Sequence, residues 1–325
     1  MKKCCLIIPY FGKFPNYFEL FLKTCQYNAN FDWLIFTDDR TSYPYPGNVH
    51  VIYMTFSEIC ERIQSKFDFQ ISLDCPYKLC DFKPTYGYIF EDYLNDYAFW
   101  GECDVDTLMG DLNHFLPDKF MNEYDKIFCL GHLTIYRNTI GNNRTFMSSY
   151  HGFKVYRKFL SSPDSFAFDE EGNEGNINRI FKECGKKVFE KDLSLNFEIR
   201  RTHFIRTIHI EGSNINGYSS FKHEKYVDAL YLWNNGKIER YYKNNGNLIR
   251  EEFPYMHLQK RNMKFNEKVL QLNCFKIVPN AFLPLEVHGS VTKANFSKIK
   301  KHIFCMHAWN VRWPVYKHRL MNLIK

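Results

Sequence analysis

The chain has 325 residues, of which 45% are hydrophobic, 24% charged and 18% aromatic, and its formal net charge is +7. This composition is globular and excludes a disordered or fibrous protein, and the length is sufficient for a large core. Residues 291–325 carry eight basic and no acidic side chains, so the remainder is close to neutral. That distribution argues against a general nucleic-acid-binding surface.

The first 65 residues alternate between strand and helix patterns. Apolar runs at residues 4–9, 31–36 and 49–54 predict strands. Helical spacing covers residues 15–27, and a second helix is expected to begin at Ser57 as its cap and run towards Lys66. This alternation predicts a doubly wound α/β fold, in which ligands bind beyond the carboxyl ends of the strands.

A charged segment then precedes a helix expected at residues 86–94. It contains Lys78, Asp81 and Lys83 within ten residues of the expected helix start. Lysines at such a place suit phosphate oxygens, and an acid there can orient a sugar or a lysine. A solvated loop explains the same three residues equally well.

Two carboxylates follow an aromatic, strand-like run at residues 97–100. Asp104 and Asp106 are separated by Val105, so an extended backbone would project both carboxylates together and turn Val105 to the packed side. Paired carboxylates of this kind suit Mg²⁺ or Mn²⁺, which bind substrate phosphates. The tripeptide alone is also common in surface turns and caps.

The order of these motifs resembles the nucleotide half of GT-A-fold glycosyltransferases. The matching motifs are Ile-Pro-Tyr-Phe at 8–11, Thr-Asp-Asp at 37–39, Lys-x-x-Asp-x-Lys-Pro at 78–84, and Phe-Trp-Gly-x-Cys-Asp-x-Asp at 99–106. The last motif, with Gly-Asp after it, resembles uncharacterised bacterial proteins of capsule and surface-polysaccharide clusters. The resemblance runs to about residue 265 and implies a Rossmann-like, doubly wound mixed sheet.

This resemblance implies roles for particular residues. Asp104 and Asp106 would bind a divalent metal, Mn²⁺ or Mg²⁺, on the donor diphosphate. Residues after the first two strands would contact the nucleotide: Pro9, Tyr10, Asp38 and Asp39. The charged segment would add further contacts, although its match to the family motif is looser: Lys78, Asp81 and Lys83.

The resemblance extends into the following segments. Residues 126–138 predict two strands broken at Gly131-His132, and His132 or Arg137 would face the donor sugar, although a strand histidine is also commonly hydrogen-bonded in a core. An acidic cluster precedes a helix expected at residues 177–184. There Asp169, Glu170 or Glu171 would serve as acceptor-side base, whereas acids also flank helix starts for dipole reasons. The predicted catalytic residues are Asp169, Glu170 and Asp106.

The last third predicts a β-meander followed by a histidine motif. Asn-Gly pairs at 235–236 and 245–246 separate three β-rich runs, which is a strong hairpin signal. Residues 253–263 then resemble the late histidine motif of metal-dependent GT-A enzymes. His257 would complete the metal shell and Lys260 would contact the diphosphate, with Arg261 as a second choice because the spacing departs from the common form.

The remaining features concern organisation and location. We expect a catalytic domain at 1–265, with halves at about 1–125 and 126–265, and an extension at 266–325 ending in a basic aromatic tail. That tail fits either peripheral contact with anionic lipid or packing on the body. There is no signal peptide, no membrane span and no zinc spacing among the 11 cysteines, which indicates a cytoplasmic protein with reduced thiols.

The sequence therefore predicts a metal-dependent hexosyltransferase-type enzyme. It would move a sugar from a nucleoside-diphosphate donor, with UDP favoured, to a hydroxyl of a surface glycan or lipid-linked saccharide. Contact of the basic tail with lipid would place the protein at the inner membrane face, and no nucleic acid is expected as a partner. Two alternatives are a metal-dependent phosphoesterase or nucleotidyltransferase, and a non-catalytic carbohydrate-binding protein.

Overall fold

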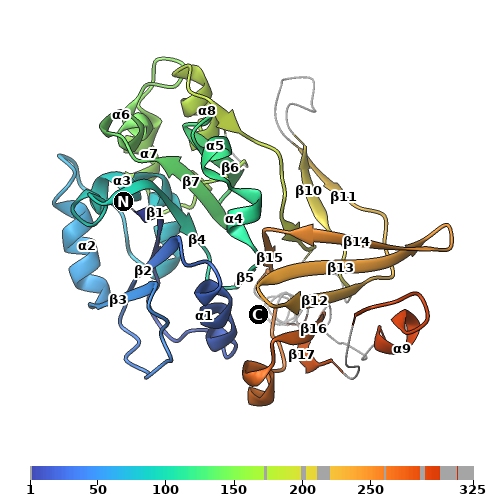
Figure 1. The fold of residues 1–325 in the computed structure, drawn as a ribbon. Helices are drawn as coiled ribbons and strands as arrows, with labels where there is room; N and C mark the ends of the chain where they lie inside the picture. Colours follow the sequence, from blue (N-terminus) through green and yellow to red (C-terminus); the bar gives the residue numbers. More distant parts are fainter. Residues whose placement is uncertain are drawn as a thin grey trace, which may run out of the picture. The chain divides into compact units, whose positions relative to one another are not determined.

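The computed structural model describes residues 2–171, 174–198, 203–210, 220–259, 261–285, 290–300 and 313. The chain forms two compact units that alternate along the sequence (Figure 1). Unit 1 combines Met1–Pro15, Asn28–Val105 and Leu116–Asp192, and unit 2 combines Asn16–Tyr27, Asp106–Phe115 and Leu193–Lys325. The domain boundaries expected at residues 125 and 265 stay predictions.

Unit 1 is built on a seven-stranded mixed sheet with the order β3-β2-β1-β4-β7-β6-β8. Its strands are β1 Lys2–Pro9, β2 Phe31–Thr37, β3 Val49–Tyr53, β4 Tyr97–Cys103, β6 Lys126–Leu130, β7 Leu133–Arg137 and β8 Val188–Phe189. The first four strands in this order are parallel, whereas β7 is antiparallel to both β4 and β6. The predicted α/β class with a mixed, mainly parallel sheet is confirmed.

The helices of unit 1 are short. They are α2 Phe56–Gln64, η1 Pro76–Thr85, α3 Tyr86–Ile89, η2 Glu91–Tyr93, α5 Asp118–Met121, α6 Ile140–Asn143, η3 Thr145–Met147, α7 Val155–Ser161 and α8 Ile177–Glu183. The expected cap of α2 at Ser57 is wrong, because Thr55 caps the helix and forms a reciprocal capping box with Glu58. The helix expected at 86–94 is divided into α3 and a 3-10 turn.

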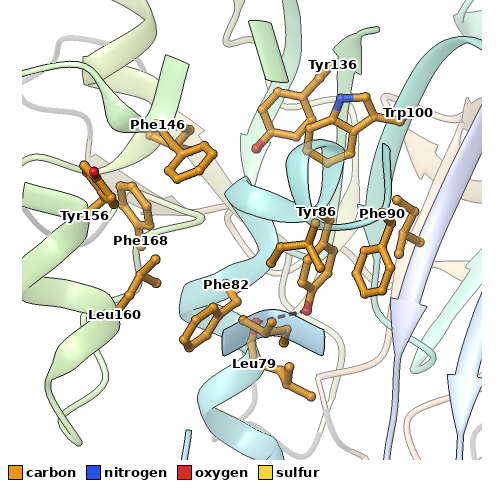
Figure 2. Close-up of a cluster of buried hydrophobic side chains, with 14 of the residues drawn as sticks. Leu79, Phe82, Tyr86, Phe90, Trp100, Tyr136, Phe146, Tyr156, Leu160 and Phe168 are labelled. Atoms are coloured by element: carbon orange, nitrogen blue, oxygen red, sulfur yellow. Dashed lines mark hydrogen bonds between the residues drawn. The ribbon is translucent and has the colours of Figure 1, made fainter. Parts of the chain in front are cut away.

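An aromatic core fixes η1 and α3 of unit 1 (Figure 2). Trp100 of β4 stacks on Tyr136 of β7 with ring centroids 4.2 Å apart. A Cβ atom at Gly87 would lie 2.2 Å from the Trp100 ring, so only glycine lets α3 approach β4 this closely. The Tyr86 hydroxyl donates to the Leu79 carbonyl at 3.0 Å and ties α3 back to η1. This packing sets the position of the charged residues that η1 carries.

Unit 2 is mainly antiparallel β-structure. Its elements are α1 Phe18–Gln26, β5 Thr107–Met109, α4 Leu112–Phe115, β9 Leu195–Asn196, β10 Thr207–Ile210, β11 Ser220–His223, β12 Leu230–Asn234, β13 Lys237–Asn244, β14 Asn247–Phe253, β15 Tyr255–His257, η4 Glu267–Gln271, β16 Cys274–Val278, β17 Ala281–Pro284 and α9 Phe296–Ile299. Its largest sheet has the order β14-β13-β12-β16-β17 (orange in Figure 1).

The predicted meander is confirmed as β12, β13 and β14. Its two turns have positive φ at both central residues, 46° and 82° at Asn235 and Gly236, and 46° and 78° at Asn245 and Gly246. These signs match the hairpin turn whose twist suits adjacent antiparallel strands, which is why asparagine and glycine occupy both positions. Local sequence therefore determines this part of unit 2.

A second, three-stranded sheet in unit 2 has the order β5-β15-β9. The middle strand β15 pairs antiparallel with β5, which places His257 opposite Thr107. On its other side β15 runs parallel to β9, with His257 opposite Asn196. Three segments distant in sequence thus meet around His257.

Three features bear on the expected location. The thiols of Cys4, Cys5 and Cys103 are buried and not joined in disulfides, and burial raises the pKa of Cys5 to about 12. Within the described ranges, no helix combines the length and apolarity that crossing a membrane requires. Most of the basic tail, residues 301–312 and 314–325, lies outside the described residues. Of its aromatic side chains, Phe296 is buried in a small apolar cluster of unit 2.

Candidate metal and donor site

The Asp-x-Asp motif lies in a turn and not in an extended strand. β4 ends at Cys103, and residues 104–106 turn before β5 begins at Thr107, so the expected extended pair is wrong. The expectation for Val105 is confirmed, since its side chain is buried. The amide of Asp104 donates to the His132 carbonyl at 3.1 Å, which ties the end of β4 to the turn between β6 and β7.

Lys83 lies close to two other predicted site residues of unit 1, Asp104 and Asp169. Its amine donates to Asp104 Oδ1 at 2.7 Å and to the Gly131 carbonyl at 2.6 Å, and lies 3.4 Å from Asp169 Oδ2. Burial opposes the charged amine, but the carboxylates of Asp104 and Asp169 outweigh it and hold the pKa of Lys83 well above its usual value. Lys83 is therefore a fixed positive charge beside the Asp-x-Asp motif.

Asp169 is buried beside this lysine. Burial raises the pKa of Asp169 to about 7 despite the opposing attraction of Lys83. A Cβ atom at Gly131 would lie 2.0 Å from Asp169 Oδ2, so glycine is needed for the carboxylate to occupy this place. Sequence reasoning treated Gly131 only as a strand break and missed this close approach.

Lys78 and Asp81 occupy a different environment, although they belong to the same motif as Lys83. The Lys78 amine donates to Asp81 Oδ2 at 2.7 Å, to the Phe159 carbonyl at 2.9 Å, and to the Asp164 carbonyl. Asp81 in turn accepts from the amides of Phe166 and Phe168. This pair therefore fixes the loop that leads to Asp169.

The residues at the ends of β1 and β2 also lie in unit 1. Pro9 is the last residue of β1, and the Tyr10 ring stacks on Phe14 with centroids 4.7 Å apart. Asp38 Oδ1 accepts from the amide of Gly12 at 2.7 Å, where a φ of 99° favours glycine. The β1 turn is thus joined to the end of β2.

Asp39 reinforces this junction. Its Oδ1 accepts from the Lys13 amine at 2.7 Å and from the Thr41 hydroxyl at 2.7 Å. Burial opposes ionisation of Asp39, but hydrogen bonds from Lys13 and Thr41 outweigh burial and lower the pKa of its carboxyl. The carboxylate therefore supports the turn around Tyr10.

In unit 2, strand pairing joins Asp106 to His257 across about 150 residues of sequence. His257 Nε2 lies 3.3 Å from Asp106 Oδ1, and the Leu258 amide donates to the Asp106 carbonyl at 2.9 Å. Both side chains are largely buried, with 9% of His257 and 13% of Asp106 exposed. The two predicted metal ligands of this unit are brought together.

The donor set fits a divalent metal ion. Only Val105 separates Asp104 from Asp106, so the chain keeps their Cα atoms within about 7 Å of each other, twice the spacing of consecutive Cα atoms. Asp104, Asp106 and His257 are a group that could hold a metal ion, with one carboxylate oxygen from each aspartate and one ring nitrogen. Carboxylate and imidazole ligands suit Mn²⁺, and carboxylates also suit Mg²⁺.

Other predicted residues have these positions. His132 is buried, and Glu170 follows Asp169 in a turn with its amide directed to the Ala167 carbonyl. Arg261 is buried, and its guanidinium donates to the carbonyls of Pro279 and Glu198. Lys260 lies outside the described residues.

Two residues of the site were not predicted. Asn196 Oδ1 lies 3.1 Å from His257 Nδ1, and Gln259 Nε2 donates to the same oxygen at 2.8 Å. Asn196 stands in no recognisable motif, and only the pairing of β9 with β15 brings it to His257. The one local signal that could have indicated Gln259 is its position two residues after His257.

Together, these features describe an α/β protein with a mixed, mainly parallel sheet that carries an Asp-Asp-His group of the metal-ligating type. The chain belongs to a family of unknown function, DUF6625, whose model matches residues 6–286. No curated protein matches it in sequence.

Solved structures similar to this chain include two glycosyltransferases. Galactosyltransferase LgtC in complex with donor and acceptor sugar analogues is 10% identical, with a TM-score of 0.33, covering 59% of this chain and 75% of that chain. Mouse xyloside xylosyltransferase 1 in its apo form is 6% identical, with a TM-score of 0.34, covering 60% of this chain and 87% of that chain. These likenesses concern the fold alone.

Proposed function

We propose that the protein is a metal-dependent glycosyltransferase that moves a sugar from a nucleoside-diphosphate donor to an acceptor hydroxyl. One observation carries the proposal: Asp106 and His257, about 150 residues apart, meet with ligand atoms 3.3 Å apart beside a second aspartate. A divalent cation would bind both groups, because a carboxylate oxygen and the unprotonated nitrogen of a neutral imidazole each present a lone pair.

The metal ligands in this proposal are Asp104, Asp106 and His257. A bound Mn²⁺ or Mg²⁺ would stabilise the charge on the leaving diphosphate, which is the main electrostatic demand of the transfer. Lys83 adds a buried positive charge next to Asp104 and would attract the same diphosphate. Lys260 is the further candidate for a diphosphate contact.

The nucleotide would bind beyond the carboxyl ends of β1 and β2, where ligands of doubly wound sheets are held. Pro9 and Tyr10 would contact the base, while Asp38 or Asp39 would contact the ribose or fix the turn that does so. Lys78 and Asp81 would act indirectly, since both are hydrogen-bonded within unit 1. UDP is the favoured nucleotide.

The acceptor hydroxyl would lose its proton to a carboxylate. Asp169 is the first candidate, because it lies 3.4 Å from Lys83 and so belongs to the same charged group as Asp104. Glu170 is the second candidate, and His132 would line the donor sugar. Removal of the proton makes the acceptor oxygen a better nucleophile at the sugar carbon.

The wider role that we propose is synthesis of a surface or capsular glycan. The acceptor would be a glycan or lipid-linked saccharide, and the enzyme would act in the cytoplasm, at the inner membrane face where the basic tail contacts lipid. Co-sedimentation of the full chain with anionic vesicles, compared with a chain ending at residue 300, tests the membrane part of this proposal.

The central test is isothermal titration of UDP, with GDP as the comparison, in Mn²⁺ and then in EDTA. We expect metal-dependent binding of UDP that weakens at least tenfold in Asp106→Asn, a nearly isosteric change that removes the charge. Asp96→Asn is the matched control, because Asp96 is exposed and precedes the same strand. Its affinity should equal that of the wild type.

A second measurement separates the transferase from its rivals. UDP-sugars incubated with Mn²⁺ should release UDP slowly and should give no UMP or sugar 1-phosphate. Rapid formation of UMP and sugar 1-phosphate would favour a phosphoesterase, and binding that survives loss of Asp104 and Asp106 would favour a carbohydrate-binding protein. Failure of both nucleotides to bind in Mn²⁺ would contradict the proposed function.

A further inference from the structure

The His257 ring lies between two side chains of different kinds. Its Nε2 is 3.3 Å from Asp106 Oδ1, and its Nδ1 is 3.1 Å from Asn196 Oδ1. An imidazole binds a metal through a nitrogen that carries no proton, so the neutral ring must keep its proton on the other nitrogen. The partner of Nδ1 therefore decides whether Nε2 is available as a ligand.

Asn196 presents an acceptor to Nδ1, and a second residue holds it in that orientation. Gln259 Nε2 donates to Asn196 Oδ1 at 2.8 Å, and one carbonyl oxygen has lone pairs for both the glutamine and the histidine. With this oxygen facing the ring, it accepts the Nδ1 proton of the neutral form whose Nε2 can bind a metal. Asn196 and His257 are both buried, so little water can compete for this bond.

The backbone makes the contact a fixed part of unit 2. The parallel register of β9 and β15 places Asn196 opposite His257, and the antiparallel register of β5 places Thr107 on the other side. Gln259 adopts φ 56°, a left-handed conformation that costs a non-glycine residue stability. In that backbone conformation, the Gln259 side chain lies within hydrogen-bond distance of Asn196.

We propose that Asn196 is the positioning residue of the metal site. Supported by Gln259, it holds the proton of His257 on Nδ1 and so presents the Nε2 lone pair on the side of Asp106. This inference rests on the proposed function, because it takes His257 as a metal ligand. Partners of this kind typically change metal affinity by about 10- to 100-fold.

The first experiment titrates Mn²⁺ into wild type, Asn196→Ala and Asn196→Asp in the absence of nucleotide. We expect Asn196→Ala to weaken Mn²⁺ binding by about 10- to 100-fold. Asn196→Asp should retain wild-type affinity or exceed it, because a carboxylate oxygen accepts the Nδ1 proton more strongly. Asn142→Ala is the matched control, since Asn142 in unit 1 is also buried and hydrogen-bonded, and it should leave affinity unchanged.

The second experiment reads the proton position directly. Ring ¹⁵N spectra of histidine-labelled protein saturated with diamagnetic Mg²⁺ distinguish the two neutral forms of imidazole, and comparison with His257→Gln identifies the signals. We expect the Nδ1–H form in wild type and in Asn196→Asp, and a mixture or the Nε2–H form in Asn196→Ala. A structural role of Asn196 alone would leave this ratio unchanged.

The outcomes separate the two proposals. Unchanged Mn²⁺ affinity and an unchanged proton position in Asn196→Ala would overturn the role of Asn196. Unchanged affinity in His257→Ala would instead remove the histidine from the metal site and with it the proposed function. If Asn196→Ala does not fold, the Nε2–H form in Mg²⁺-saturated wild-type protein would by itself overturn the inference. Gln259→Ala should then show a smaller loss of Mn²⁺ affinity than the loss of about 10- to 100-fold expected for Asn196→Ala.

Discussion

Lys78 and Lys83 belong to one short motif, yet the structure uses them differently. Both are buried in η1, and both form an ion pair at 2.7 Å with an aspartate. Lys78 binds Asp81, whose side chain is fully buried, and two backbone carbonyls. Lys83 binds Asp104, whose side chain is 35% exposed, and lies near Asp169.

The difference shows that a charge pair can serve the fold or the site according to its surroundings. The partners of Lys78 are all parts of the folded chain, so its pair with Asp81 is complete without a ligand. The pair of Lys83 with Asp104 includes a carboxylate that solvent reaches, and this carboxylate belongs to the candidate metal group. We therefore expect substitutions at the two lysines to differ in how metal affects them.

The largest effect should follow Lys78→Met. It leaves Asp81 charged and buried without its counter-charge, which costs about 3–5 kcal/mol of the free energy of unfolding. Urea denaturation followed by circular dichroism measures this loss, and Mn²⁺ should not restore it. Lys158→Met in α7, an exposed lysine, should change stability by less than about 0.5 kcal/mol. A loss below about 1 kcal/mol in Lys78→Met would contradict the stabilising role that distinguishes the Lys78–Asp81 pair from the Lys83–Asp104 pair.

Lys83→Met should cost less, roughly 1–3 kcal/mol, because water can partly solvate the exposed part of Asp104. Mn²⁺ should raise the melting temperature of this variant more than that of the wild type, since the ion replaces the lost positive charge. Differential scanning calorimetry with and without Mn²⁺ tests this, with Lys83→Arg as the charge-preserving control. Equal shifts in variant and wild type would show that Lys83 and the metal are independent.

Gly131→Ala should cost about 1 kcal/mol, the low end for overpacking, because the added methyl group meets the end of the Asp169 side chain and not backbone. The new methyl group would displace the Asp169 carboxylate, which Lys83 faces. Urea denaturation of Gly131→Ala, Asp169→Ala and the double variant forms a double-mutant cycle. The double variant should lose less stability than the sum of the two single losses, and simple additivity would contradict the contact.

The smallest effect concerns a third pair, Asp39 with the mostly exposed Lys13. The pKa of Asp39 is lowered in the folded protein, so its contribution to stability is present above pH 3.8, the ordinary value, and is lost as pH falls further. The stability difference between wild type and Asp39→Asn should therefore be constant from pH 7 to 5 and shrink towards pH 3. Urea midpoints of the two proteins across this range measure the stability difference. A difference that grows on acidification would contradict the lowered pKa of Asp39.

Much of the fold follows from local patterns in the sequence. Continuous apolar runs predict β1 and β2, and the two Asn-Gly pairs predict the turns of the meander. The cap of α2 was also predictable, because Thr55 and Glu58 have the spacing of a capping box that Ser57 lacks. These features depend on residues within a few positions of one another.

The site was only partly predictable, because its contacts join distant segments. The spacing of Asp104 and Asp106 predicted two metal ligands, and the resemblance to a family motif added His257. No local signal could separate the environment of Lys78 from that of Lys83. The backbone acceptors of Lys78 lie in α7 and just after it, and that of Lys83 lies in the β6–β7 turn. Asn196 likewise depends on a strand register that forms only in the folded chain.

The alternation of the two units along the chain has a consequence for biosynthesis. Helix α1 and the two residues before it are among the first parts to be translated. Yet the Asn16 side-chain Nδ2 donates to the Met263 carbonyl 247 residues later, and the Tyr17 ring packs on Phe282. The apolar face of α1 therefore stays exposed to solvent, or bound to a chaperone, until translation is almost complete. Nascent chains stalled before residue 263 should hold α1 in a protease-sensitive state that full-length chains lose.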